Sequence, residues 1–200
     1  MPTQLLIIFI KNINPGKVKT RLARTIGDTA AVKIYQALVD ITENATTLLK
    51  IDRRIYFSET IVNGKWEDDH KRIQQGRNLG ERMRNAFIDG FRDGYSQIIL
   101  IGSDLPSISK SIIEKGFIVL NKSDVVFGPA SDGGYYLIGM SKFQNCIFEN
   151  KPWSTPSLLY STLEELKDKD ITVSLLDTLN DIDTLEDLRG FPELIKLISI

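Results

Sequence analysis

The 200-residue sequence has one cysteine, one histidine and no long hydrophobic run. Because Cys146 has no second cysteine to pair with, an intramolecular disulfide is excluded, and His70 alone cannot build a histidine-rich zinc site. The apolar run at residues 5–10 is too short to span a bilayer and lacks the small-residue cleavage site of a secretory signal. It predicts a buried strand, and we expect a protein of the reducing cytoplasm.

An excess of charge of either sign is also lacking. The chain has 25 basic and 26 acidic side chains, which give a formal net charge of -1. No global electric field therefore draws it to nucleic acid or to an anionic membrane, and we expect neither as a partner. With 42% hydrophobic residues the chain can build one good core, so we expect a single domain over residues 1–200. The oligomeric state is open, with a homodimer as one option.

Several common catalytic signatures are absent. With a single histidine and no G-x-S-x-G motif, hydrolysis by a Ser-His-Asp triad has no basis in the sequence. A Walker A loop requires glycine where Val18 stands, and the string "GGYYLIG" does not fit the G-x-G-x-x-G pattern. The sequence therefore supports neither a P-loop ATPase nor a nicotinamide-dependent enzyme.

The sequence does contain a regular alternation of strand-like and helix-like segments. Short apolar runs bounded by turn residues or charges predict strands at 4–10, 53–58, 97–103, 124–130, 135–140 and 171–176. Amphipathic stretches between them predict helices at 28–50, 79–92, 109–121, 156–168 and from 184 towards 198.

The apolar pattern of the strands predicts how they are arranged. The continuous hydrophobicity of "LLIIFI" and "IILI" is typical of strands that are covered on both faces. We therefore predict the α/β class, with a sandwich around a mostly parallel sheet. The string "SDGG" joins two strand-like runs and predicts a hairpin, so part of the sheet is expected to be antiparallel.

A basic loop, "GKVKTRL" at residues 16–22, follows the first predicted strand. It places Lys17, Lys19 and Arg21 at alternate positions, and no acidic residue occurs before Asp28. If this loop is extended, the three cations lie on one side, and if it is helical, Lys17 and Arg21 are one turn apart and repel each other. Both geometries favour an anionic ligand, although a solvated surface loop is the alternative.

Charged residues follow most of the predicted strands. In open parallel sheets ligands bind at the carboxyl ends of the strands. Here those ends carry the following residues: Lys11 and the basic loop, Asp104, Asp132, and Asp181 with Asp183. Carboxylate oxygens suit Mg²⁺ or Mn²⁺, and nearby cations suit the phosphates that complete the metal shell. This edge of the sheet therefore predicts metal-assisted chemistry on a nucleotide.

Each of these residues also has a purely structural interpretation. Asp104 could cap the helix predicted near Ser109, and Asp183 could be a favourable negative charge at a helix N-terminus. Gly133 and Gly134 could serve a turn in which Asp132 bonds the backbone. Further alternatives are that Gly80 is a helix cap, that Arg82 faces solvent, that His70 is a surface residue and that Cys146 is buried and inert.

Six ordered sequence blocks over nearly the whole chain carry a family resemblance. They are "FIKNINPGKVKTRLA", "GRNLGERMRNAF", "IGSDLPSI", "VVFGPASDGGYYLIGM", "PWST" and "NDIDTLEDL". In this order they resemble the DUF2064 family of predicted glycosyltransferases. That family is similar to the nucleotide-diphospho-sugar transferase (GT-A) superfamily, which includes the molybdenum-cofactor and 2-phospholactate guanylyltransferases. The resemblance implies a three-layer α/β/α sandwich with a mostly parallel, mixed sheet.

The resemblance also implies roles for individual residues. Asp104 resembles the superfamily's metal-binding aspartate, Asp183 is similar to the second metal ligand, and Lys19 and Arg21 match the residues that meet the phosphates. Asp104, Lys19 and Arg21 are thereby implied in catalysis. The nucleotide-binding set implied is Lys11, Lys17, Lys19, Arg21, Gly80 and Arg82. The residues implied on the acceptor or sugar side are Asp132, Gly133, Gly134 and Trp153.

The chain departs from the family pattern in two places. Asn12-Ile13-Asn14-Pro15 stands where the family has proline directly after the first lysine, and "GSDLP" holds one aspartate rather than a DxD pair. The shifted loop affects the placement of Lys11 most.

Two reactions fit the implied site. The first is a metal-dependent transfer of a sugar from a nucleoside diphosphate sugar to a small acceptor, with Mg²⁺ or Mn²⁺ as cofactor. The second is nucleotidyl transfer of the guanylyl or cytidylyl type, from a nucleoside triphosphate with release of pyrophosphate. A non-catalytic nucleotide-binding module is the alternative from another class, because fold analogy does not choose the chemistry.

Overall fold

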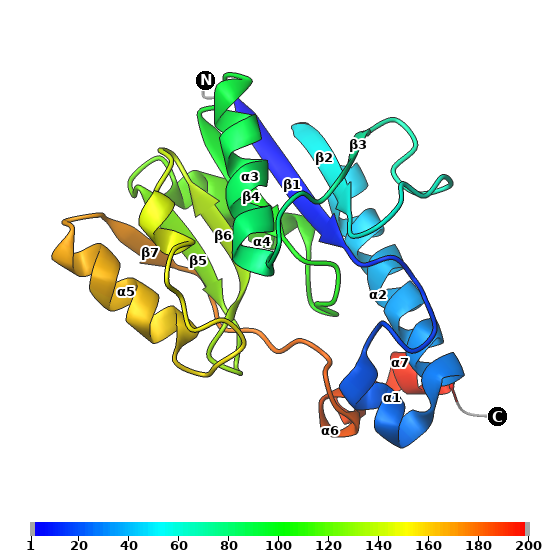
Figure 1. The fold of residues 1–200 in the computed structure, drawn as a ribbon. Coiled ribbons are helices and arrows are strands. Elements are labelled where there is room, and N and C mark those ends of the chain that lie inside the picture. The colour runs from blue at the N-terminus through cyan, green and yellow to red at the C-terminus, as the bar shows by residue number, and fades with distance from the viewer. Residues whose placement is uncertain (1–2, 199–200) are drawn as a thin grey trace.

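The computed structural model describes residues 3–198 and contains a seven-stranded sheet flanked by helices (Figure 1). Its strand order is β3-β2-β1-β4-β6-β5-β7. The strands are β1 (Gln4–Ile10), β2 (Asp52–Phe57), β3 (His70–Ile73), β4 (Gln97–Ile101), β5 (Val125–Pro129), β6 (Tyr135–Met140) and β7 (Val173–Leu175). Strand β6 runs antiparallel to β4 and β5, whereas the other paired strands run parallel.

Helices connect the strands. They are α1 (Thr20–Ile26), α2 (Asp28–Thr47), α3 (Leu79–Arg92), α4 (Lys110–Val119), α5 (Leu158–Asp168), α6 (Leu185–Arg189), α7 (Pro192–Lys196) and the 3-10 turn η1 (Asn145–Ile147). The predicted strands 4–10 and 135–140 and the predicted helix 79–92 are confirmed with the same bounds. The predicted continuous helix from 184 is wrong, because Gly190 ends α6 and Pro192 starts α7.

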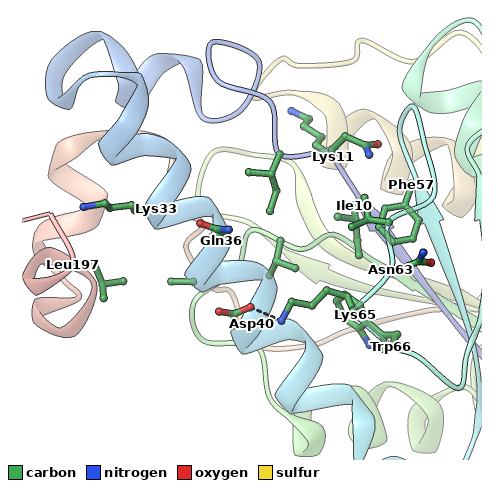
Figure 2. Close-up of a pocket in the computed structure, with 16 residues that line it drawn as sticks. Ile10, Lys11, Lys33, Gln36, Asp40, Phe57, Asn63, Lys65, Trp66 and Leu197 are labelled. Carbon is green, nitrogen blue, oxygen red and sulfur yellow. Dashed lines mark ion pairs between the residues drawn. The ribbon is translucent and has the colours of Figure 1, made fainter.

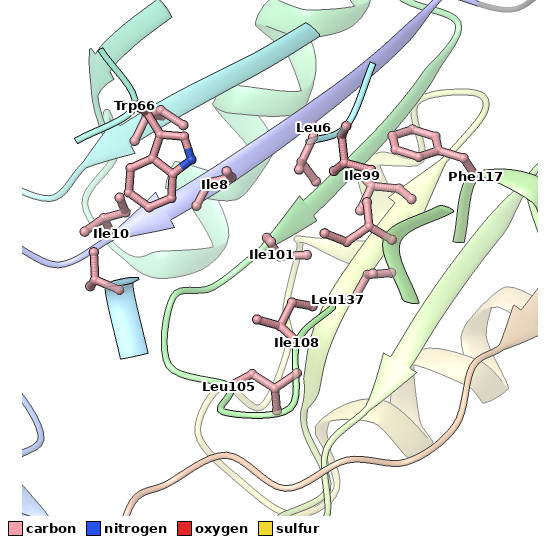
Figure 3. Packing of buried hydrophobic residues seen from close by; sticks show 14 of the residues in the cluster. Leu6, Ile8, Ile10, Trp66, Ile99, Ile101, Leu105, Ile108, Phe117 and Leu137 are labelled. Carbon is pink, nitrogen blue, oxygen red and sulfur yellow. The ribbon is translucent and has the colours of Figure 1, made fainter. Parts of the chain in front are cut away.

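Strand β1 shows why its apolar run is continuous rather than alternating. Leu6, Ile8 and Ile10 belong to the hydrophobic core on the face covered by α2 and α4, which Figure 3 shows around Ile99 and Phe117. The intervening residues of β1 pack into a second core against α3 and α5 on the opposite face. Because both faces are buried, every position of the strand from Leu5 to Ile10 is apolar. The predicted α/β sandwich with three layers and a mixed sheet is therefore confirmed.

A third apolar cluster lies beside the sandwich. It joins α1, α2, α6 and α7, which Figure 1 shows grouped at one end of the molecule. Leu22 of α1, Leu38 of α2 and Leu188 of α6 are fully buried in it, together with Ile182 from the segment before α6. This cluster packs the segment around Ile182 against α1 and α2.

Strand β3, helix α1 and the 3-10 turn η1 escaped prediction from the sequence. Strand β3 has the polar sequence HKRI and lies at the edge of the sheet, so no apolar pattern marks it. Helix α1 begins at Thr20 inside the basic loop, and the loop is therefore neither uniformly extended nor uniformly helical. Within residues 3–198, no helix combines the length and the apolar character that crossing a membrane requires.

The predicted hairpin between β5 and β6 is confirmed, and its turn is tightly docked. Gly133 has φ +89°, and a Cβ at this position would lie 2.0 Å from the carbonyl oxygen of Pro156. The amide of Leu159 donates to the Gly133 carbonyl, and Asp132 Oδ1 accepts from the Gly134 amide. The turn thus rests on the segment that leads into α5.

This packing predicts different costs for two Gly→Ala substitutions. Gly133→Ala should lower the free energy of unfolding by about 3 kcal/mol, because a left-handed backbone and an overpacked contact both oppose the methyl group. Gly64→Ala is the matched control, since Gly64 has φ +80° but open space around its Cα, and it should cost about 1 kcal/mol. Urea unfolding measures both, and equal losses would contradict the docking of the turn.

Candidate active site

Residues from three strand ends meet at one edge of the sheet. Lys19 follows β1, Asp104 follows β4 and Asp183 follows β7. The Lys19 Nζ atom lies 3.2 Å from Asp104 Oδ2 and 3.9 Å from Asp183 Oδ1. Arg21 Nη1 donates to Asp183 Oδ2 over 3.0 Å. The structure therefore brings together four of the residues selected from the sequence, although 164 positions separate Lys19 from Asp183.

Asp181 and Asp132 lie near this group. Burial first, and then the Asp104 carboxylate, raises the pKa of Asp181 to about 6, with Asp132 and Asp183 acting in the same direction and Lys19 against it. Asp104, Asp132, Asp181 and Asp183 are called the carboxylate cluster below. The sequence places Asp181 after the last predicted strand, but neither the pattern nor the family resemblance assigns it a role. The one sequence feature that points to it is its position two residues before Asp183.

Lys19 is held in an uncommon conformation. It has φ 45° and ψ 45°, which is the left-handed region that lysine rarely adopts, and it occupies the position just before α1. Val18 and Leu22 on either side are buried, so the backbone is fixed by the core. The Lys19 side chain is 5% exposed and reaches the carboxylates from below the surface. A backbone cost on the order of 1–2 kcal/mol thus accompanies this placement.

Asp104 is positioned by the loop after β4. Ser103, the preceding residue, shares a hydrogen bond of 2.8 Å with the Tyr35 hydroxyl, which also accepts from the Lys11 amide. Burial raises the pKa of Tyr35 to about 12, so this hydroxyl stays protonated. Ser109 caps α4 by accepting from the Ile112 amide, and the interpretation of Asp104 as that cap is wrong.

Asp183 immediately precedes a well-capped helix. Thr184 is the N-cap of α6 and forms a capping box with Asp187, whose carboxylate also accepts from the Asp183 amide. The helix terminus is therefore satisfied without the Asp183 side chain. That side chain is free to face Lys19 and Arg21 instead.

The remaining lysines of the predicted phosphate site lie elsewhere. Lys17 pairs with Glu59 over 3.2 Å. Lys11 lines a cavity of about 660 Å³ together with Gln36, Phe57 and Trp66, between β1, β2 and α2. Figure 2 shows these side chains around the cavity. Within residues 3–198, no hydrogen bond or ion pair joins the side chain of Lys11 to the carboxylate cluster.

Gly80 packs against Trp153, which lines a second cavity. A Cβ on Gly80 would lie 2.6 Å from the Trp153 indole, so glycine is required for this close packing. Asn78 is the N-cap of α3, and the interpretation of Gly80 as that cap is wrong. Arg82 Nε donates to the Gly76 carbonyl. Trp153 lines the cavity of about 740 Å³ with Arg77, Asn78 and Arg84 among others.

The donor chemistry of the carboxylate cluster fits a hard divalent cation. Asp104 and Asp183 each present a carboxylate oxygen to the Lys19 ammonium group, at 3.2 Å and 3.9 Å. Within residues 3–198, no three His, Cys, Asp or Glu side chains form a group that could hold a metal. Mg²⁺ is commonly held by one or two carboxylates, with waters and substrate phosphates completing its shell.

Comparison with known proteins supports the fold and the class. The family model described as "Uncharacterized protein conserved in bacteria (DUF2064)" matches residues 43–155. A proposed nucleotide-diphospho-sugar transferase from Desulfovibrio desulfuricans G20 is 30% identical over 100% of both chains, with a TM-score of 0.86. A search of curated proteins finds no sequence similar to this chain.

More distant solved structures share the fold alone. The inositol-1-phosphate CTP transferase from T. maritima is 16% identical, with 99% of this chain and 97% of that chain covered and a TM-score of 0.58. Rv0371c from Mycobacterium tuberculosis H37Rv, solved in complex with manganese, is 14% identical over 98% of this chain and 100% of that chain, with a TM-score of 0.55.

The chain is thus a transferase with the nucleotide-diphospho-sugar transferase fold. It belongs to the DUF2064 family, as its sequence blocks indicated.

The raised pKa of Asp181 predicts a pH-dependent stability in the absence of metal. The folded state binds this proton more tightly than the unfolded chain, whose carboxyl group has the ordinary pKa of 3.8, so the protein loses stability as pH rises from about 4 to 6. Asp181→Asn removes this loss. At pH 7 the free energy of unfolding of the variant should be about 1 kcal/mol higher than that of the wild type, because partial exposure to solvent weakens the effect.

Urea unfolding in EDTA between pH 4 and 8 measures this effect for the wild type and the variant. The difference in free energy of unfolding should grow between pH 4 and 6 and stay constant above pH 7. A difference that is independent of pH would contradict the electrostatic description of Asp181.

Proposed function

We propose that this chain transfers a glycosyl group from a nucleoside diphosphate sugar to a small acceptor, with the carboxylate cluster as its centre. The observation that carries the proposal is the meeting of two carboxylates and two cations, Asp104 and Asp183 with Lys19 and Arg21, at the edge where such folds bind ligands. The 30%-identical relative from D. desulfuricans supports the sugar nucleotide as donor. Residues 1–200 would act as one domain.

Asp104 and Asp183 would hold the divalent ion, Mg²⁺ or Mn²⁺. When bound, such an ion neutralises charge on the donor phosphates and on the departing diphosphate. The carboxylates are 44% and 41% exposed, so a ligand can reach them from solvent. Rv0371c, which has the same fold, was solved with manganese.

Lys19 and Arg21 would bind the phosphate oxygens. Charge-assisted hydrogen bonds from lysine and arginine to phosphate are strong and stabilise the negative charge that develops on the leaving group. Arg21 is 68% exposed and pairs with one carboxylate, so its guanidinium keeps donors for a ligand. Lys11, which lines the cavity beside α2, and Lys17, which pairs with Glu59, would contribute to nucleotide binding at longer range.

The segments beside the carboxylate cluster would bind the rest of the two substrates. Asp132 with the turn at Gly133 and Gly134 adjoins the cluster, and this turn rests on the segment that also carries Trp153. We assign this side to the acceptor or sugar. Gly80 and Arg82, at the start of α3, are assigned to the nucleotide.

Nucleotidyl transfer is the second candidate, since the same four residues would serve a triphosphate and structures with this fold include a CTP transferase. It predicts pyrophosphate release from one of the four nucleoside triphosphates with a phosphorylated acceptor. Donor hydrolysis or transfer from a nucleoside diphosphate sugar, without pyrophosphate release, favours the first candidate. Nucleotide binding that needs no metal, with no turnover of either kind, would indicate a non-catalytic module.

The proposal predicts a strong effect of Asp104→Asn. UDP, GDP, CDP and their sugars should be screened for thermal stabilisation with and without Mn²⁺, because a ligand that binds the folded state raises Tm. In the variant the Mn²⁺-dependent part of this shift should disappear, and turnover should fall at least about 100-fold.

Asp177→Asn is the matched control, because Asp177 is also an exposed aspartate paired with a lysine, Lys115, but lies outside the carboxylate cluster. It should retain the shift and the turnover. Metal-dependent turnover that survives in Asp104→Asn would overturn the assignment of the site.

A further inference from the structure

The ammonium group of Lys19 contacts both of the carboxylates proposed as metal ligands. Its Nζ atom contacts Asp104 Oδ2 at 3.2 Å and Asp183 Oδ1 at 3.9 Å. A Mg²⁺ or Mn²⁺ ion shared by the same carboxylates would need oxygen ligands at about 2.0–2.2 Å and would therefore compete with the ammonium group for the same two oxygens. The lysine head and the ion cannot bind these two oxygens together.

The lysine cannot withdraw into the protein. Its backbone is fixed in the left-handed conformation between the buried Val18 and Leu22. Its side chain is only 5% exposed, so no deeper position is open to it. The direction left for the ammonium group is outward, past the carboxylates that are open to solvent. There it would remain within a few ångströms of a divalent cation and would repel it unless an anion lay between them.

A phosphate oxygen is the anion that meets this requirement. It can accept a hydrogen bond from the displaced ammonium group and, on its other side, contact the ion. Arg21 adds a second donor at the same edge. The charges then balance, because the two phosphates of a diphosphate compensate the added divalent charge.

From this geometry, and resting on the proposed function, we infer that Lys19 occupies the metal position in the free protein and yields it only when a diphosphate arrives. The site then takes the divalent ion and the diphosphate as a pair, and free metal binds weakly. Because coupling between two ligands is reciprocal, the diphosphate should raise the affinity for the metal by the same factor as the metal raises the affinity for the diphosphate.

The test compares Mn²⁺ binding to three proteins without nucleotide, from the EPR signal of free Mn²⁺. Lys19→Met removes the competing charge and should bind Mn²⁺ at least about 10-fold more tightly than the wild type. Lys151→Met is the matched control, since Lys151 is also a buried lysine, 3% exposed, paired with Glu165 away from the carboxylate cluster. It should bind Mn²⁺ like the wild type.

The second arm adds whichever of UDP, GDP or CDP stabilises the wild type most. This diphosphate should raise the Mn²⁺ affinity of the wild type about 10-fold or more, and that of Lys19→Met by clearly less. Lys19→Gly, which also relieves the left-handed backbone, serves if the methionine variant does not fold. Circular dichroism confirms that each variant is folded.

The outcomes separate the inference from the function on which it rests. Suppose that Mn²⁺ binds the wild type, that this binding is lost in Asp104→Asn, and that the folded Lys19 variants bind Mn²⁺ no more tightly than the wild type does. The inference is then overturned, and the proposed function stands. If Mn²⁺ binds neither the wild type nor the Lys19 variants, with or without diphosphate, the metal site itself is wrong and both fall.

Discussion

The pairing of Lys19 with Asp104 and Asp183 is the interaction on which the carboxyl edge of this protein depends. It joins the loop after β1, the end of β4 and the segment before α6, which are far apart in the sequence. Each part is anchored separately by the apolar cores, through Val18, Leu105 and Ile182 respectively. The ion pairs themselves add little stability where they are exposed, so the cores hold the charges in place rather than the reverse.

Crowding of like charges is the consequence of this arrangement. Asp104 and Asp183 pair with Lys19 and Arg21, and burial of Asp181, followed by the nearby Asp104 carboxylate, raises the pKa of Asp181. An isolated acidic cluster would repel itself or take up protons. Here the buried ammonium group relieves part of the repulsion, and a divalent cation would relieve more. The electrostatics of the edge therefore favour the binding of a cation. The exposed guanidinium of Arg21 can bind an anion next to that cation.

Most of the fold could be predicted from the sequence, because strands that are buried on both faces, such as β1 and β4, contain continuous runs of apolar residues. Edge strand β3 left none, since half-exposed polar residues form it. The site residues were selected by their position after strands and by family resemblance, and the structure gathers Lys19, Arg21, Asp104 and Asp183. The side-chain directions were not readable. Lys17 turns to Glu59, and Gly80 lies under Trp153. Such directions depend on long-range packing that no local pattern records.

The reversed direction of β6 has a further consequence for the edge. A parallel connection from β5 would leave the edge through a helix, whereas the antiparallel hairpin places residues 130–134 there as a bare turn. This turn touches the segment before α5 but belongs to neither helical layer. Exchange of its exposed residues Ser131 and Asp132, rather than of the docked Gly133, would change the surface at this edge while the hydrophobic cores stay intact. If this side binds the acceptor, as proposed, these two positions are where acceptor preference would change at the least structural cost.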